Sequence, residues 1–121
     1  VSPAMYRGCH ASKKMNEAFK ARNPHLANRI ISCSFEECYH QWIASDEVIV
    51  ATFGTPNYIM KTYLEMLANH CRKVFLMFYK EGYCPLLYRS MNHYEYSLKD
   101  IKELFNGYHC VEYEDYIVVY G

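Results

Sequence analysis

The stretch YHCVEYEDYIVVY, residues 108–120, decides the fold of this chain. Residues 108–113 and residues 116–120 are both rich in aromatic and β-branched side chains, which favour strands. Only Glu114 and Asp115 separate these two segments. Because a parallel crossover needs a dozen or more residues, two strands joined so closely must be antiparallel. The chain is therefore predicted to end in an antiparallel hairpin.

Upstream of the hairpin, strand-like runs alternate with helical patterns. The strand-like runs lie at residues 5–9, 29–33, 47–52 and 73–79. Residues 47–52 and 73–79 are so rich in apolar side chains that they favour strands buried on both faces of a parallel sheet.

Cap residues mark the helices between these strands. Ser12 predicts a helix that runs to about Arg22, with an apolar stripe of Met15, Ala18 and Phe19. Ser34 and Glu37 have capping-box spacing for a short helix toward His40. A third helix is expected to begin at Thr55 and Pro56, and a fourth at Ser97, ending at Gly107. The third should bury one apolar face, made of Ile59, Met60, Tyr63, Leu64 and Leu67.

This order predicts a single α/β domain over residues 1–121. Its sheet should be open and mostly parallel, with helices on both faces and the antiparallel hairpin at its C-terminal edge. Thirteen basic and thirteen acidic residues leave no net charge that would attract nucleic acid or an anionic membrane. The apolar runs are also far shorter than the roughly 20 residues that span a bilayer. We therefore expect no nucleic-acid partner and no membrane association.

Six cysteines are spread along the chain without a CxxC pair. Periodic helices and strands lie between them, unlike the loops of a disulfide framework. We therefore expect mostly buried, reduced cysteines in a cytoplasmic protein. Several cysteines have a histidine beside them, as at His70 and Cys71. Adjacent residues on a strand point to opposite faces, so these pairs predict no metal site.

Several segments, taken in order, resemble the class I (Rossmann-like) S-adenosylmethionine-dependent methyltransferases. Residues 6–12 resemble the family's second strand and the turn after it, and residues 28–37 resemble the third strand and the turn that borders the adenine. Residues 46–54 resemble the fourth strand, whose end lies under the sulfonium, and residues 73–79 the fifth. With the terminal hairpin, the resemblance covers about residues 6–121.

The resemblance implies methyl transfer from S-adenosylmethionine to a small-molecule acceptor. Ligands of open α/β sheets bind at the carboxyl ends of the strands, where strand order reverses. His93 is the candidate general base, and Tyr58 a second catalytic candidate. The strand ends carry the implied cofactor-binding residues: His10, Ala11, Ser34, Phe35, Glu36, Ala51, Thr52 and Phe53. Further candidates for the substrate side are Tyr79, Tyr83, Tyr88, Arg89 and Tyr94. Ordinary turn chemistry explains the same serines and threonines equally well.

The chain departs from the family pattern at the cofactor site. His10 and Ser34 stand where acidic residues are usual, and a neutral imidazole lacks the charge and the two oxygens of a carboxylate. No Gly-x-Gly-x-Gly loop is present. In the family this loop follows a first strand that lies between the second and the fourth, and only five residues precede residue 6, where the resemblance begins. We expect an upstream segment or a partner chain to supply that strand, or the remaining strands to pair directly. The chain alone should be inactive. The alternative is a non-catalytic Rossmann-like interaction module.

Overall fold

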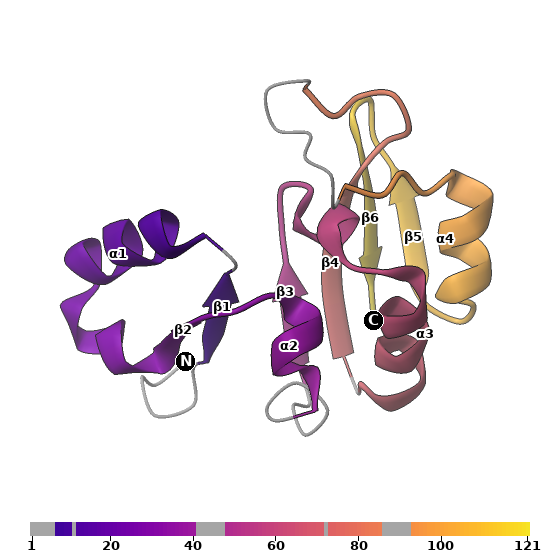
Figure 1. Ribbon diagram of the computed structural model, residues 1–121. Helices are drawn as coiled ribbons and strands as arrows, with labels where there is room; N and C mark the ends of the chain where they lie inside the picture. Colours follow the sequence, from indigo (N-terminus) through magenta and orange to yellow (C-terminus); the bar gives the residue numbers. More distant parts are fainter. Residues whose placement is uncertain (1–6, 11, 41–47, 72, 86–92) are drawn as a thin grey trace. The chain divides into compact units, whose positions relative to one another are not determined.

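The computed structural model describes residues 7–10, 12–40, 48–71, 73–85 and 93–121 (Figure 1). It is a mixed α/β fold with two open sheets, which confirms the predicted fold class at this level. The chain divides into two compact units, residues 1–42 and residues 43–121, and each is described by itself. Among the described residues, no helix is long and apolar enough to cross a membrane.

Unit 1 is built on a pair of short parallel strands. Strand β1 (Gly8–His10) pairs with β2 (Ile30–Ser32), and Cys9 lies opposite Ile31. Helix α1 (Lys13–Arg22) and the 3-10 helix η2 (Pro24–Arg29) form the crossover between them. Helix α2 (Phe35–Tyr39) follows β2. This is the strand–helix–strand–helix order that the sequence predicts.

Helix α1 begins where the sequence predicts but turns a different side toward the strands. The Ser12 Oγ accepts a hydrogen bond from the Met15 backbone N–H at 3.2 Å, which confirms the N-cap. The predicted apolar stripe is wrong: Met15 is 59% exposed, whereas Asn16 is buried. The Asn16 amide donates to the His10 carbonyl and to the Ser32 Oγ, both at 2.9 Å. Because β1 and β2 are so short, their ends leave polar groups that an amide satisfies and an apolar stripe cannot.

Unit 2 contains a four-stranded mixed sheet. Strand β3 (Val48–Ala51) pairs in parallel with β4 (Lys73–Tyr79). The terminal strands β5 (His109–Glu112) and β6 (Tyr116–Tyr120) form the predicted antiparallel hairpin. Strand β6 also pairs antiparallel with β4, so the order is β3-β4-β6-β5. The last strand of the chain therefore lies inside the sheet and the strand before it at the edge.

Two helices cover one face of this sheet, α3 (Lys61–His70) and α4 (Leu98–Leu104) (Figure 1). The Ser97 Oγ accepts from the Asp100 N–H at 3.1 Å, which confirms the predicted start of α4. The helix ends earlier than predicted, at Leu104 with Phe105 as its C-cap, and Gly107 follows in a turn with a φ of +93°. The core between helices and sheet contains Leu64, Leu67, Leu76, Phe78, Ile101, Phe105, Ile117 and Val119, each at most 2% exposed.

The other face of the unit 2 sheet is open among the described residues. Val48 and Val50 of β3 are 58% and 66% exposed, and Phe75 of β4 is 40% exposed. In β4 exposed or half-buried side chains alternate with buried ones. The prediction that both strands are buried on both faces is therefore wrong. The two α-helices described in this unit lie on the same face of the sheet, so the apolar composition of β3 and β4 does not mean that the opposite face is also covered.

The segment after β3 also differs from the prediction of one helix from Thr55. Gly54 adopts a left-handed conformation with a φ of +82°, and the 3-10 helix η4 (Thr55–Tyr58) follows it. Ile59 is extended, so α3 begins separately at Lys61 and Met60 is 44% exposed. The Asn57 side chain holds η4 against β4, because its Oδ1 accepts from the Tyr79 N–H at 2.7 Å. This tertiary contact interrupts the helix that the sequence pattern favours.

Candidate functional site

The carboxyl ends of β1 and β2 are tied together in unit 1. The His10 carbonyl accepts a hydrogen bond from the Cys33 backbone N–H at 3.1 Å, so the two strand exits lie side by side. The His10 side chain is turned back on its own loop, where Nδ1 accepts from the Ser12 N–H at 2.9 Å. One ring nitrogen is therefore used structurally. Ala11 lies outside the described residues.

The Glu36 carboxyl is partly buried in the turn after β2. Ser34 has a structural role, because its Oγ accepts from the Glu37 N–H at 3.1 Å and its own N–H donates to the Glu37 carboxylate. Phe35 is half-buried, and its ring lies 5.8 Å from that of Tyr39. The Glu36 Oε1 is buried without a hydrogen-bond partner among the described residues, and desolvation raises the pKa of this carboxyl. Glu36 therefore offers a buried acceptor to a donor of a ligand.

The exit of β3 is a strained turn. Ala51 is buried and Thr52 is half-buried, and the Thr52 carbonyl accepts from the Thr55 N–H and Oγ1 at 3.1 and 2.7 Å. Phe53 has a φ of +51°, a left-handed conformation that is unusual for a bulky residue, and it is 70% exposed. Such strain costs about 1–3 kcal/mol and is concentrated at functional sites.

The two predicted catalytic residues of unit 2 lie close together. The Tyr58 and His93 rings meet edge to face with their centroids 5.5 Å apart. Asn57 fixes this arrangement with two hydrogen bonds to Tyr94. Its side-chain Nδ2 donates to the Tyr94 carbonyl at 2.9 Å, and its backbone carbonyl accepts from the Tyr94 N–H at 2.7 Å. Desolvation, with a smaller contribution from Cys84, raises the pKa of Tyr58, so its phenol keeps its proton near neutral pH. Tyr58 is therefore a hydrogen-bond donor rather than a base.

Further aromatic side chains gather beside the β3 and β4 exits. The Tyr116 ring stacks on Tyr79 at 5.0 Å and meets the edge of Phe53 at 6.2 Å. Tyr83 is 49% exposed, and the Lys80 ammonium lies 5.8 Å from its ring centroid. Tyr88 and Arg89 lie outside the described residues. The sequence did not single out Tyr116 for this position, because its strand pattern indicates only an ordinary amphipathic face.

A groove of about 660 Å³ runs along the open face of the unit 2 sheet. It is mostly apolar and lies on β4, β6 and the hairpin turn. Its lining residues are Phe75, Met77, Tyr113, Asp115, Tyr116, Val118 and Tyr120. Tyr116 belongs to both the groove and the aromatic cluster beside Phe53, so the groove reaches the strand exits of unit 2.

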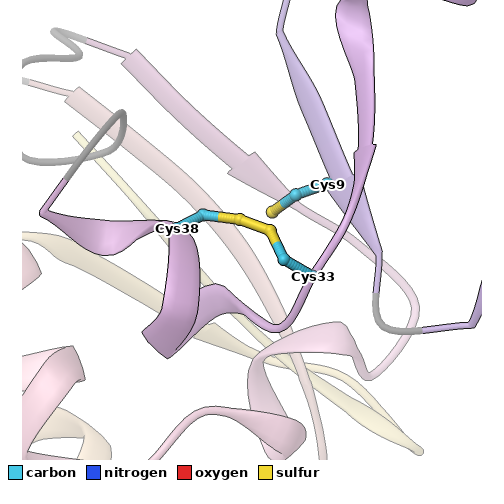
Figure 2. A group of neighbouring side chains, drawn as sticks. All are labelled: Cys9, Cys33 and Cys38. Atoms are coloured by element: carbon cyan, nitrogen blue, oxygen red, sulfur yellow. A yellow bond between two sulfur atoms is a disulfide. The ribbon is translucent and has the colours of Figure 1, made fainter.

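Three cysteines converge in unit 1 (Figure 2). A disulfide joins Cys33 to Cys38, which corrects the expectation of reduced cysteines at these two positions. The Cys9 sulfur points toward this disulfide, and the three sulfur atoms all lie within 4.8 Å of one another. Cys71, Cys84 and Cys110 are thiols. Pairs of adjacent cysteines and histidines do not reveal this cluster, because the β1–β2 register brings Cys9 to it and the turn from β2 into α2 brings Cys33 and Cys38 together.

Each unit therefore carries part of the predicted site: the Glu36 turn in unit 1, and Phe53 with the Tyr58–His93 pair in unit 2. Comparison with protein family models, with curated proteins and with solved structures found no match. The support for a function thus comes from the chain's own residues.

Proposed function

We propose that this chain is part of a class I S-adenosylmethionine-dependent methyltransferase domain that acts on a small-molecule acceptor. The observation that carries the proposal is the order of strand pairing. Two parallel pairs, β1 with β2 and β3 with β4, are followed by an antiparallel terminal hairpin. The resemblance of the sequence to this family rests on the same order.

Glu36 supports an adenine-binding role for the turn after β2. The buried Glu36 Oε1 has no hydrogen-bond partner in the part of the chain that the structure describes. Burial of an unpaired carboxylate oxygen is costly, and a ligand N–H group would offset that cost. The exocyclic amine of adenine is such a donor. His10 fits a ribose less well, because the ring nitrogen Nδ1 already accepts the Ser12 N–H. We therefore expect Glu36 to contribute more to cofactor affinity than His10.

The strained turn at Phe53 and the Tyr58–His93 pair support an acceptor-binding role for unit 2. S-adenosylmethionine would supply the methyl group by in-line displacement, a reaction that needs mainly alignment of donor and acceptor. Tyr58 would donate a hydrogen bond that orients the acceptor, and His93 would take a proton from an acceptor oxygen or nitrogen. The exposed Phe53 ring would contact the apolar part of the acceptor.

The proposal includes a further strand–helix segment, from an upstream stretch or a partner chain. Among the described residues, β1 pairs only with β2 and β3 only with β4, so each has an edge to which another strand can bind. The open apolar face of the unit 2 sheet likewise suits a covering helix. This segment would also carry the glycine-rich loop.

Calorimetric titration with S-adenosylmethionine tests the proposal. The chain is titrated as it stands and in a form extended upstream by its own coding sequence. We expect binding in the extended form, weakened about tenfold or more by Glu36→Gln, which removes the charge but keeps the shape. Glu17→Gln, an exposed change on α1, is the matched control and should leave the affinity unchanged. Equal affinities of Glu36→Gln and Glu17→Gln for S-adenosylmethionine would show that Glu36 does not contribute to cofactor binding.

The second candidate function is a non-catalytic interaction module. The open apolar face favours it, because large exposed apolar patches mark binding surfaces. His10 in place of an acidic residue agrees with loss of cofactor binding. Absence of S-adenosylmethionine binding in both forms of the chain would favour this function over the enzyme.

A further inference from the structure

We propose that Cys9, Cys33 and Cys38 form a binding site for one thiophilic metal ion, with Zn²⁺ as the reference ion, when the Cys33–Cys38 disulfide is reduced. The three sulfurs come from strand β1, the turn after β2 and helix α2 (Figure 2). This inference is independent of the proposed methyltransferase function, because it uses no residue assigned to the cofactor or the acceptor.

The spacing of the sulfur atoms suits a shared metal ion. With Zn–S bonds of about 2.3 Å and tetrahedral angles, two thiolates on one ion lie roughly 3.8 Å apart. The three sulfurs here lie within 4.8 Å of one another. Cys38 is 2% exposed, and Cys9 and Cys33 are half-buried. Two of the three cysteines are thus partly accessible to solvent, and water or a small ligand would fill the fourth position of a tetrahedral site.

Backbone interactions hold the three cysteines in place without help from the sulfurs. The parallel register fixes Cys9 opposite Ile31. The Cys33 N–H donates to the His10 carbonyl, one residue beyond Cys9. The Ser34–Glu37 capping box sets the start of α2 and with it the position of Cys38. Reduction of the disulfide should therefore leave three thiols close together rather than disperse them.

Reduction of the disulfide precedes binding of the metal ion. A dithiol reductant gives two electrons and two protons to the Cys33–Cys38 bond and is itself oxidised to a disulfide. This yields two thiols beside the thiol of Cys9. Metal binding then releases the three thiol protons and forms three metal–sulfur bonds. A disulfide oxidant reverses the first step: it takes two electrons from the Cys33 and Cys38 thiolates, which form their S–S bond, and is itself reduced to a dithiol. The ion then loses two of its three ligands and dissociates, and the Cys9 thiolate regains a proton, so occupancy depends on the redox state.

The test uses the chain in its reduced and oxidised forms. Zn²⁺ is titrated against a chromophoric chelator without oxygen, after reduction by a dithiol and removal of the excess reductant. We expect one ion per reduced chain and no tight binding to the oxidised chain. Co²⁺ in place of Zn²⁺ should give a sulfur-to-cobalt charge-transfer band, which reports thiolate ligands directly.

Single substitutions identify the ligands. Cys9→Ser should weaken Zn²⁺ binding about 100-fold or more and lower the cobalt charge-transfer band by about one third, since one of three thiolates is lost. Cys33→Ser should have the same effect. The control is Cys110→Ser, a half-buried cysteine in β5 of unit 2, and it should bind like the original chain. Circular dichroism checks that each variant remains folded.

Alkylation with mass spectrometry gives a second measurement, in which bound Zn²⁺ should protect Cys9, Cys33 and Cys38 but not Cys110. The inference is overturned if the reduced chain binds no stoichiometric metal. It is also overturned if Cys9→Ser and Cys110→Ser bind equally well, because such binding would not come from this cluster.

Discussion

Gly54 shows how a single residue is fixed by its surroundings. It has a φ of +82°, and a Cβ at this position would overlap the Tyr79 ring. We expect Gly54→Ala to lower the free energy of unfolding by about 3 kcal/mol, from backbone strain of about 1 kcal/mol and steric overlap of about 2 kcal/mol. Denaturant unfolding measures the change.

Gly82→Ala is the matched control for that change. Gly82 has a φ of +84° but no atom within 4 Å of its Cβ position, so only the backbone strain of about 1 kcal/mol applies. Equal losses of unfolding free energy in Gly54→Ala and Gly82→Ala would mean that the Tyr79 ring moves aside without cost. Steric overlap with this ring would then not constrain Gly54.

Asn57 carries the contacts between η4, β4 and the segment that begins at His93. Its side chain is 1% exposed and hydrogen-bonded at both ends, to the Tyr79 N–H and the Tyr94 carbonyl. We expect Asn57→Ala to destabilise the chain by about 2–5 kcal/mol, because two partly buried backbone groups lose their partners. Denaturant unfolding should show no comparable loss for the exposed Asn106→Ala. A loss below about 0.5 kcal/mol for Asn57→Ala would show that water replaces the amide.

The cap serines can be predicted from the sequence, whereas the buried asparagines cannot. Ser12, Ser34 and Ser97 cap their helices as predicted, because each capping bond spans only three residues. The burial of Asn16 and Asn57 was not predicted, because their hydrogen-bond partners lie up to 16 and 37 residues away in the sequence. Nothing in the nearby sequence marks either asparagine as buried.

At the scale of elements, the start of α4 should respond to acid. Hydrogen bonds from the backbone and side chain of Ser97 lower the pKa of Asp100 below its usual value of 3.8. A lowered folded-state pKa contributes stability above the unfolded value, and this stability is lost as pH falls through the folded value. We expect Asp100→Asn to lose less stability than the original chain below about pH 4.

Unfolding midpoints measured between neutral pH and pH 2 check this expectation. Asp115→Asn, an exposed change in the hairpin turn, is the control and should follow the original chain. A profile of Asp100→Asn that runs parallel to that of the original chain at every pH would show that the capping box of α4 does not depend on the charge.

The break between η4 and α3 shows the limit of reading elements from pattern. Thr55 and Pro56 favour a helix start, and Pro56 does lie at the start of η4. The pattern continues through Ile59 and Met60, but Ile59 is extended and a new helix begins at Lys61. The hydrogen bond between Asn57 and Tyr79 is a contact with a distant strand, and it outweighs the local preference.

At the scale of the whole molecule, the strands of unit 2 should differ in protection. Strand β4 has a partner on both edges, β3 and β6, whereas β3 pairs only with β4 among the described residues. We expect the amides of β4 to exchange with solvent about tenfold more slowly, or more, than those of β3. Hydrogen exchange with mass spectrometry measures both strands in one experiment.

The same measurement on the form extended upstream tests whether another strand binds these edges. The β1 and β3 amides should exchange more slowly in the extended form. Exchange of the β5 amides should stay unchanged, because the proposed strand does not adjoin β5. Unchanged exchange in β1 and β3 would contradict the insertion of a strand at either edge.

By itself the sequence determined the serine N-caps of three helices, most strand positions, the alternation of strands and helices, and the terminal antiparallel hairpin. These features depend on interactions within a few residues or on a loop too short for any other connection. Only the tertiary structure decided that β6 lies between β4 and β5, that one sheet face is open, and that three sulfurs meet in unit 1. Such features depend on which distant segments pair and in which register, and no local pattern encodes that choice.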